Sequence, residues 1–376
     1  MTTTSETFDP GKPLAGLLVV SLEQAVAEPY CSSRLADAGA RVIKIERAEG
    51  DFARGYDYAV NGLATYFVWL NATLLHRILE QADVFIQNPV PGAAKRAGFG
   101  SDVLQRSNSR LVTVDISGHG VGNSYTDMKA YDLLVQAETG VAGIIGHPAG
   151  PGRVSVSVCD VACGMSAYAG VLEALVGRSR RNRGARLEVS LFDAVADWMN
   201  VPLLYFEGTG AAPQRVGLAH PSICPYGVFE TFDGHLVLIS IQNEREWASL
   251  CTAFLGEAEL PKTPGFESNN ARVANRPAVD AKVAASFREL SRERAAEILR
   301  AAQIAYGFVN DLADLASLPA LRRVSIGTSA GVALVIAPAV IHDQRTPQFG
   351  PVPQTANTQT KCGASSRRNK SKTRGA

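Results

Sequence analysis

Residues 17–46 read LLVVSLEQAVAEPYCSSRLADAGARVIKIE, and this stretch decides the fold. The apolar run Leu17–Ser21 is typical of a buried parallel strand. Pro29 suits the first position of a helix over Tyr30–Ala38, and a second strand, Arg41–Glu46, follows directly. This strand–loop–helix–strand unit predicts a doubly wound α/β domain.

The same alternation continues along the first half of the chain. Strands are predicted over Val84–Gln87, Leu111–Ile116 and Leu187–Ser190, and a long helix rich in small and apolar residues over Val161–Val176. A chain that alternates strands and helices in this way favours a parallel sheet with helices on both faces. The loop after the first strand lacks the GxGxxG spacing, so the sequence does not indicate a dinucleotide site.

The pattern changes after residue 210. Val228–Phe232 and Leu236–Ile241 flank a short Asp-Gly turn, which is a strong hairpin signal. Helices are predicted over Glu246–Phe254 and Val279–Arg300. A second, smaller α+β domain is therefore expected in this part of the chain.

We predict two domains and a tail. The C-terminal stretch has no hydrophobic periodicity and carries six basic residues without one acid, which is typical of a disordered segment. A large, Rossmann-like α/β domain is expected to take residues 1–215 and to be completed by residues 317–353, with the small domain over residues 216–316 and a disordered basic tail over residues 354–376.

The composition is that of an ordinary globular protein. The chain has 376 residues, 46% of them hydrophobic, and a formal net charge of +1. This near-neutral balance argues against a dedicated nucleic-acid binder. No apolar run approaches the roughly 20 residues of a membrane span, and the polar N-terminus lacks the pattern of a signal peptide. We therefore expect a cytoplasmic protein that binds neither nucleic acid nor a membrane.

The six cysteines indicate neither disulfides nor a metal site. They are scattered, and the closest pair, Cys159 and Cys163, has no further ligand at zinc-site spacing. We interpret the cysteines as reduced core thiols. The sequence also lacks a GxxxxGK[ST] loop, an EF-hand and an HExxH motif.

Asp160 is the strongest candidate for a catalytic residue, because it directly precedes the helix predicted over Val161–Val176. One interpretation is an N-cap, whose carboxylate accepts backbone N–H bonds and stabilises the helix by about 0.5–2 kcal/mol. The other is a carboxylate nucleophile, which the positive end of a helix keeps ionised and exposed. Spacing alone favours the N-cap, and the small residues Ala162 and Gly164 leave room for a ligand near the backbone.

Other candidates follow the ends of predicted strands, where parallel sheets bind their ligands. Arg47 comes after the second strand, and its guanidinium is suited to stack on an adenine or to hold a phosphate. Asn88 follows Val84–Gln87, and Lys95 and Arg96 lie on the short helix beyond it. Together these side chains are the ones expected around a nucleotide phosphate, whereas each taken singly is more often a solvated surface residue.

The histidines give weaker signals. His119, in a Gly-His-Gly turn, is expected to lie in a flexible surface turn, although a catalytic role stays open. His220 and Ser222 are two residues apart in a chain without a GxSxG motif, so a serine hydrolase is not indicated.

Several stretches, taken together, resemble the family III CoA-transferases, the group that includes formyl-CoA transferase and the related acyl-CoA racemases. The resemblance covers most of residues 14–325, and its combination of stretches is specific. KAYDLLVQAE and HPSICPYGVF are the parts most similar to enzymes that act on small dicarboxylic acyl groups, such as mesaconyl-CoA C1–C4 transferase and succinyl-CoA-dependent transferases. The stretches are SLEQAVAEPYCSSRLADAGARVIKIER (21–47), GDFARG (50–55), ADVFIQNPVPGAAKRAGFG (82–100), KAYDLLVQAETG (129–140), CDVACGMSAYAGVLEAL (159–175) and HPSICPYGVFETFDG (220–234).

This resemblance implies a mechanism that needs no metal and no permanently bound cofactor, because the coenzyme A thioester is itself the substrate. Asp160 falls at the position of the catalytic aspartate, which would form a mixed anhydride and then an aspartyl-CoA thioester. The implied partners are an acyl-CoA, a small carboxylic acid and a second copy of the chain in an interlocked homodimer. The implied CoA-binding residues are Gln24, Ala25, Val26, Ala27, Arg47, Asn88, Arg96, Lys129 and Tyr131.

Tyr131 separates the two branches of the family. The racemases carry a histidine at this place, whereas a tyrosine with a pKa of about 10 is a poor partner base. We therefore favour a transferase over an acyl-CoA racemase or isomerase. Two departures from the family pattern leave a third alternative, an inactive truncated copy that at most binds CoA. After Asn71 the chain skips a basic turn and a strand, and the basic tail replaces a returning C-terminal helix.

Overall fold

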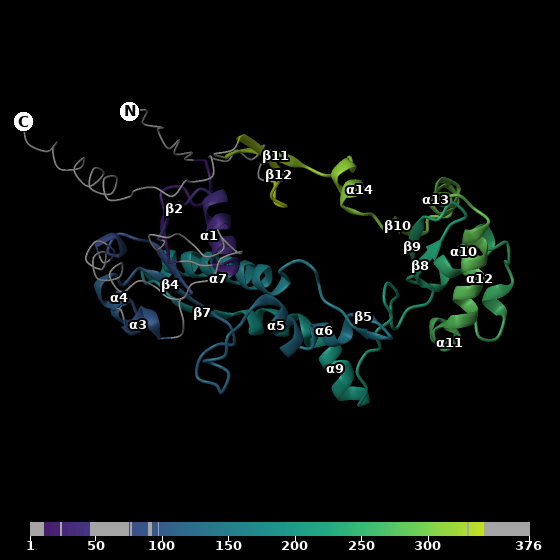
Figure 1. The fold of residues 1–376 in the computed structure, drawn as a ribbon, viewed down its shortest axis with the longest axis horizontal. Helices are drawn as coiled ribbons and strands as arrows, with labels where there is room; N and C mark the ends of the chain where they lie inside the picture. Colours follow the sequence, from purple (N-terminus) through teal and green to yellow (C-terminus); the bar gives the residue numbers. More distant parts are fainter. Residues whose placement is uncertain are drawn as a thin grey trace, which may run out of the picture.

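The computed structural model describes residues 11–22, 25–45, 75, 77–88, 92–96, 98–328 and 331–341. The described elements gather in two bodies that are connected by extended segments (Figure 1). The body with the N-terminal elements holds a parallel sheet, and the other body holds a small antiparallel sheet covered by helices.

The parallel sheet contains five described strands in the order β2-β1-β3-β4-β7. Every neighbouring pair runs parallel. This confirms the predicted α/β class with a parallel sheet. The strands are β1 (Leu18–Leu22), β2 (Arg41–Lys44), β3 (Val84–Gln87), β4 (Val112–Ser117) and β7 (Arg186–Ser190).

Helices cover both faces of this sheet, as a doubly wound fold requires. Helices α1 (Ala27–Asp37) and α7 (Val158–Arg181) pack together on one face and bury Leu35, Cys163 and Val171 against the strands. On the other face a smaller cluster packs around α4 (Ser101–Ser107), which follows the short α3 (Ala93–Arg96). The apolar side chains of the central strands therefore supply both clusters.

Helix α7 is the longest described helix and is a core element. In the described part of the chain it alone is long and apolar enough to cross a membrane by length and composition. It packs against α1, α8 (Leu191–Ala196), β4 and β7. These contacts place it in the interior of the parallel-sheet body.

Short elements connect the sheet to the rest of the chain. Between β4 and α7 lie α5 (Asp132–Glu138), α6 (Val141–Ile144) and the two-residue strands β5 (Gly146–His147) and β6 (Gly150–Pro151). After α8 the chain continues through the 3-10 helix η2 (Asp197–Met199) into α9 (Asn200–Thr209).

The smaller body has its own sheet and its own core. The hairpin of β8 (Tyr226–Glu230) and β9 (Leu236–Ser240) confirms the Asp-Gly turn signal, and β10 (Ala305–Phe308) adds a third antiparallel strand. Its core gathers around Trp247, Phe287 and Leu299. The covering helices are α10 (Glu244–Ala253), η3 (Leu260–Lys262), α11 (Asn269–Ala274), α12 (Arg276–Arg288) and α13 (Arg292–Ala301).

The single helix predicted over Val279–Arg300 is wrong, because two helices occupy this stretch. Helix α12 ends at Arg288, and Ser291 starts α13 as an N-cap whose hydroxyl accepts a hydrogen bond from the Arg294 backbone N–H. A capping serine stops one helix and begins the next, which hydrophobic periodicity alone does not reveal.

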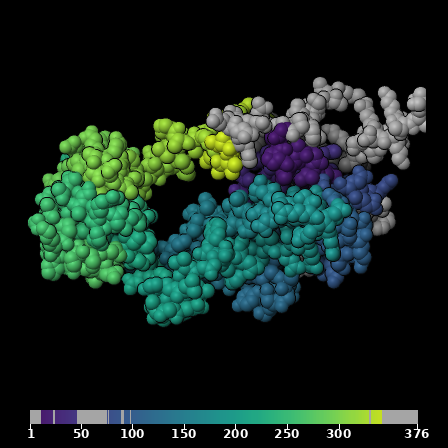
Figure 2. Space-filling model, turned by 180° about the vertical axis from the view of Figure 1, so that it is seen from behind, coloured from purple at the N-terminus to yellow at the C-terminus, as the bar shows by residue number. Residues whose placement is uncertain are grey.

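The chain then returns towards its N-terminal part through α14 (Leu312–Ser317) and an antiparallel pair, β11 (Arg323–Thr328) and β12 (Gly331–Ile336). In the space-filling view an opening lies between the two bodies, bordered on either side by the segments that connect them (Figure 2). The predicted loss of a strand after Asn71, the stretch beyond residue 341 and the predicted basic tail lie outside the described residues.

Candidate active site at the start of helix α7

Asp160 lies in the first turn of α7 and is half-buried. The helix begins at Val158 after Ser157, so the sequence-based interpretation of Asp160 as the N-cap is wrong. Since the helix starts earlier than the apolar pattern predicts, the Asp160 carboxylate does not have the capping role.

The first turn of α7 is capped by a carboxylate from a different element. Ser157 makes no side-chain capping hydrogen bond. The backbone N–H of Cys159 instead donates to Oδ1 of Asp132, the first residue of α5, at 2.7 Å. Sequence reasoning missed Asp132, although an acidic residue in the first turn of a helix is a recognisable signal.

Burial makes the Asp160 carboxyl group a weaker acid than an ordinary aspartate. Desolvation, followed by the negative charge of Asp132, raises the pKa of Asp160 to about 6. The positive end of α7 was expected to keep this carboxylate strongly ionised, and burial outweighs that effect. A raised pKa in a half-buried carboxyl group marks a functional-site candidate.

Helix α1 approaches the beginning of α7 very closely. A methyl group on Gly164 would lie 2.5 Å from the Ala27 carbonyl oxygen and 2.9 Å from Cβ of Tyr30. Gly164 is one helical turn after Asp160, so the start of α1 lies beside the candidate carboxylate. This contact brings the predicted CoA-binding residues Ala27 and Val26, at the start of α1, close to Asp160.

The remaining predicted CoA-binding residues occupy loops and helix ends. Ala25 has a positive φ of 63°, and Asn88 is half-buried directly after β3. Arg96 ends α3 and is exposed, as are Lys129 and Tyr131 immediately before α5. Gln24 and Arg47 lie outside the described residues.

The structure corrects the expectation of a surface turn at His119. This side chain is buried and packs against the rings of Tyr125 and Phe192 at centroid distances of 5.7 and 5.9 Å. His220 accepts a hydrogen bond on Nδ1 from the backbone N–H of Ser222. Because the ring is engaged by the backbone, these two residues do not form the serine–histidine pair of a hydrolase.

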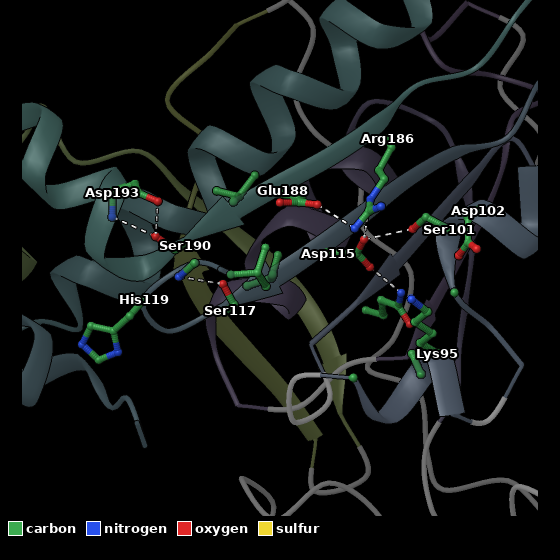
Figure 3. Close-up of a pocket in the computed structure, with 18 of the residues that line it drawn as sticks. Lys95, Ser101, Asp102, Asp115, Ser117, His119, Arg186, Glu188, Ser190 and Asp193 are labelled. Atoms are coloured by element: carbon green, nitrogen blue, oxygen red, sulfur yellow. Dashed lines mark hydrogen bonds and ion pairs between the residues drawn. The ribbon is translucent and has the colours of Figure 1, made fainter. Parts of the chain in front are cut away.

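A polar cavity of about 710 Å³ lies at the carboxyl ends of β3, β4 and β7 (Figure 3). Asp115 is its most connected side chain: it accepts hydrogen bonds from Gln87 and Ser101 and pairs with Arg186. Among the described lining residues the carboxylates outnumber the cations. Asp160 does not line this cavity, and the charged lining residues are Lys95, Asp102, Asp115, Arg186, Glu188 and Asp193.

The described cysteines are buried and unpaired, as predicted. They are Cys31, Cys159, Cys163, Cys224 and Cys251. Burial raises the pKa of the Cys163 thiol to about 12, and nearby carboxylates add to the effect. Within the described ranges no cluster of three or more His, Cys, Asp or Glu side chains could hold a metal ion.

The fold agrees with the class of protein that the family comparison identifies. The model of CoA-transferase family III matches residues 14–331. The chain therefore belongs to CoA-transferase family III, which confirms the resemblance seen in the sequence.

Individual relatives are CoA-transferases. The chain is 33% identical over 365 residues to acetyl-CoA:oxalate CoA-transferase from Acetobacter aceti, covering 91% of this chain and 92% of that protein. It is 30% identical over 328 residues to succinyl-CoA:glutarate CoA-transferase from Mus musculus, covering 82% and 74% of the two chains.

Solved structures share the fold. A CaiB/BaiF family protein from Brucella suis is 29% identical, with a TM-score of 0.69 over 82% of this chain and 86% of that one. Rv3272 from Mycobacterium tuberculosis has a TM-score of 0.79, at 22% identity, over 91% of this chain and 96% of that one.

Proposed function

We propose that the protein transfers coenzyme A between a short dicarboxylic acyl-CoA and a free carboxylic acid, with Asp160 as the nucleophile. The observation that carries this proposal is the half-buried Asp160 carboxylate in the first turn of α7, beside the start of α1. A carboxylate nucleophile must be ionised yet poorly solvated, and a pKa of about 6 meets both needs at neutral pH.

The first half of the reaction releases the donor acid. An Asp160 oxygen attacks the thioester carbonyl carbon, the carbon–sulfur bond breaks, and CoA leaves as a thiolate. The products are the thiolate and a mixed anhydride between Asp160 and the acyl group. The thiolate then attacks the aspartyl carbonyl carbon of the anhydride, which releases the donor carboxylate and leaves an aspartyl-CoA thioester.

The second half repeats these steps with the acceptor. A carboxylate oxygen of the acceptor attacks the aspartyl-CoA carbonyl, and the CoA thiolate leaves. The thiolate then attacks the acceptor carbonyl of the new anhydride, which yields the acyl-CoA product and regenerates the Asp160 carboxylate. Anhydride and thioester are of similar reactivity, so the cycle needs no metal and no permanently bound cofactor.

The names of the relatives support a dicarboxylic substrate. Proteins similar to this chain are named for transfer of CoA to oxalate, glutarate and mesaconate, which are all dicarboxylic acids. Which of these classes of acid serves as acceptor here is decided by assay with a panel of acids.

We assign CoA binding to the residues around the starts of α1 and α5. Ala25, Val26 and Ala27 form the turn into α1, and Lys129 and Tyr131 precede α5 as exposed side chains. The N-termini of these helices favour the negative charges of the CoA phosphates. Arg47, Gln24, Asn88 and Arg96 complete the proposed site.

An interlocked homodimer is the proposed assembly, formed in the cytoplasm. The opening between the two bodies has the shape that a second chain would need to pass through (Figure 2). Exposed apolar side chains on α9 and β12, such as Val201 at 78% and Val332 at 76%, would be covered in such a dimer. The proposed domain bounds are 1–215 with 317–353, and 216–316.

The test is to trap the Asp160 intermediate. The protein is incubated with succinyl-CoA and then hydroxylamine, and the peptide that contains residue 160 is examined by mass spectrometry for a hydroxamate. We expect the adduct in the wild type and in the control Glu173→Gln, an exposed acid on the same helix, and none in Asp160→Asn. CoA exchange to mesaconate, glutarate, oxalate or malate is measured in parallel.

Three outcomes overturn the proposal. Full turnover in Asp160→Ala would show that Asp160 is not the nucleophile. Exchange of an α-hydrogen with solvent, without CoA transfer, identifies a racemase or isomerase instead. Bound CoA with neither adduct nor transfer identifies an inactive CoA-binding copy.

A further inference from the structure

Asp132 is held by two N–H donors from different parts of the chain. Its Oδ1 accepts from the Cys159 backbone N–H and its Oδ2 from Nε2 of Gln136, both at 2.7 Å. Both oxygens of the side chain are therefore acceptors, which a carboxylate satisfies and an asparagine amide does not. The geometry requires an aspartate at this position.

Gln136 in turn anchors the segment that leads into α7. Its side chain is fully buried, and its amide group makes two hydrogen bonds with the Val154 backbone. Oε1 accepts from Val154 N at 2.9 Å, while Nε2 donates to Val154 O at 3.1 Å. Gln136 and Asp132 thus join α5 both to the segment before α7 and to its first turn.

The side chains around the start of α7 concentrate negative charge. Asp132 of α5 acts directly on Asp160, and Glu28 of α1 and Asp193 of α8 lie close enough to act on Cys163 one turn further. The neighbouring thiols of Cys159 and Cys163 have pKa values raised to about 12 and stay neutral. None of the groups that shift the pKa of Asp160 or of these thiols is a cation.

We propose that Asp132 is a positioning residue that fixes the first turn of α7 and holds a second negative charge beside Asp160. Asp132 does not touch the reacting atoms in this proposal, since both its oxygens are occupied by N–H donors. The hydrogen bonds that Asp132 accepts from Cys159 and Gln136 hold the turn that carries Asp160 in place. The negative charge of Asp132 keeps the Asp160 carboxylate basic and nucleophilic. This inference rests on the proposed function only for its catalytic consequence.

The experiment measures the titration of Asp160 directly and needs no turnover. Protein labelled with ¹³C at the aspartate carboxyl carbons is titrated by NMR, and the Asp160 signal is assigned by its loss in Asp160→Asn. We expect a midpoint near the pKa of about 6 in the wild type. In Asp132→Asn the midpoint falls by less than half of the rise from 3.8, because burial is the larger cause.

Two matched variants separate charge from position. Glu138→Gln removes an exposed acid from the last turn of the same helix α5 and should leave the midpoint unchanged. Gln136→Met keeps both carboxylates and the Cys159 hydrogen bond but removes the bonds that join Asp132 and α5 to Val154, so the Asp160 midpoint should stay near the wild-type value while kcat falls. If CoA transfer is active, the acid limb of its kcat profile should move to lower pH in Asp132→Asn and stay in place in Glu138→Gln.

The proposal is overturned if Asp160 titrates at the wild-type midpoint in Asp132→Asn. It is also overturned if Glu138→Gln shifts the Asp160 midpoint as much as Asp132→Asn does. Should Asp132→Asn fail to fold, Gln136→Met decides, because an unchanged kcat in that variant refutes the positioning role. A lower Asp160 midpoint in Asp132→Asn, in a protein that never transfers CoA, refutes the proposed function alone.

Discussion

The contact between α1 and α7 is the most sensitive packing feature near the candidate site, and Gly164→Ala tests it. The added methyl would meet the Ala27 carbonyl oxygen at 2.5 Å and the Tyr30 side chain at 2.9 and 3.1 Å. A backbone carbonyl within a helix cannot turn aside, so the helices must separate. Overpacking of this kind costs about 1–3 kcal/mol.

Gly170→Ala, two turns further along the same helix, is the matched control. Its methyl would meet only the flexible end of Leu187, at 3.4 Å. Each substitution gains about 0.8–1.0 kcal/mol from the higher helix propensity of alanine, and this gain cancels when the two variants are compared. The difference in unfolding free energy between the variants is therefore the overpacking cost of about 1–3 kcal/mol.

The assay is thermal unfolding of both variants and the wild type under one set of conditions. In domains of this size each kcal/mol corresponds to about 2–4 °C, so Gly164→Ala should melt roughly 2–12 °C below Gly170→Ala. CoA binding should also weaken in Gly164→Ala, because the turn over Ala25–Ala27 moves away from Asp160. Equal melting temperatures, or a higher one for Gly164→Ala, would refute the close approach of α1 and α7.

Two further predictions concern buried charges. The pKa of Asp160 is raised to about 6, so the native state loses stability as the pH rises from about 4 to about 6. Asp160→Asn should therefore stabilise the protein by about 1 kcal/mol at pH 8, after discounting for solvent screening, and should not stabilise it at pH 4. Melting curves of wild type and variant at both pH values check this, and an equal difference at the two would contradict it. In the smaller body, Arg272 is 1% exposed, pairs with Glu244 and donates to the Cys224 carbonyl, so Arg272→Met should cost about 3 kcal/mol. Calorimetry should then show a separate early transition for this body, and a single unshifted transition would speak against an independent core.

Strands with simple local signals could be predicted closely from the sequence. All four residues of β3, Val84–Gln87, are buried, and the strand occupies the predicted residues because an apolar run between polar residues has few alternatives. The β8–β9 hairpin followed from its Asp-Gly turn for the same reason. The bounds of such elements are set by residues nearby in the chain, so they can be predicted from the sequence alone.

Helix boundaries that depend on distant residues could not be predicted. The start of α7 lies at Val158 rather than Val161, because Asp132, 27 residues before Cys159, caps the helix from α5. The sequence offered Asp160 as an N-cap or as a nucleophile, and the helix start at Val158 excludes the N-cap. The sequence does not show how α5 lies against α7, and that arrangement decides which acid caps and which is left available.

Opposing influences act on the pKa of Asp160, the proposed nucleophile. A helix N-terminus favours a carboxylate by about 0.3–1 kcal/mol, which would lower the pKa. Desolvation and the Asp132 charge act in the opposite direction and prevail, since the pKa rises from 3.8 to about 6. At pH 7 such a carboxyl group is ionised by about ten to one, yet it is far more basic than a solvated aspartate. A nucleophile gains reactivity with basicity, so burial next to Asp132 would make the proposed nucleophile more reactive without leaving it protonated at neutral pH.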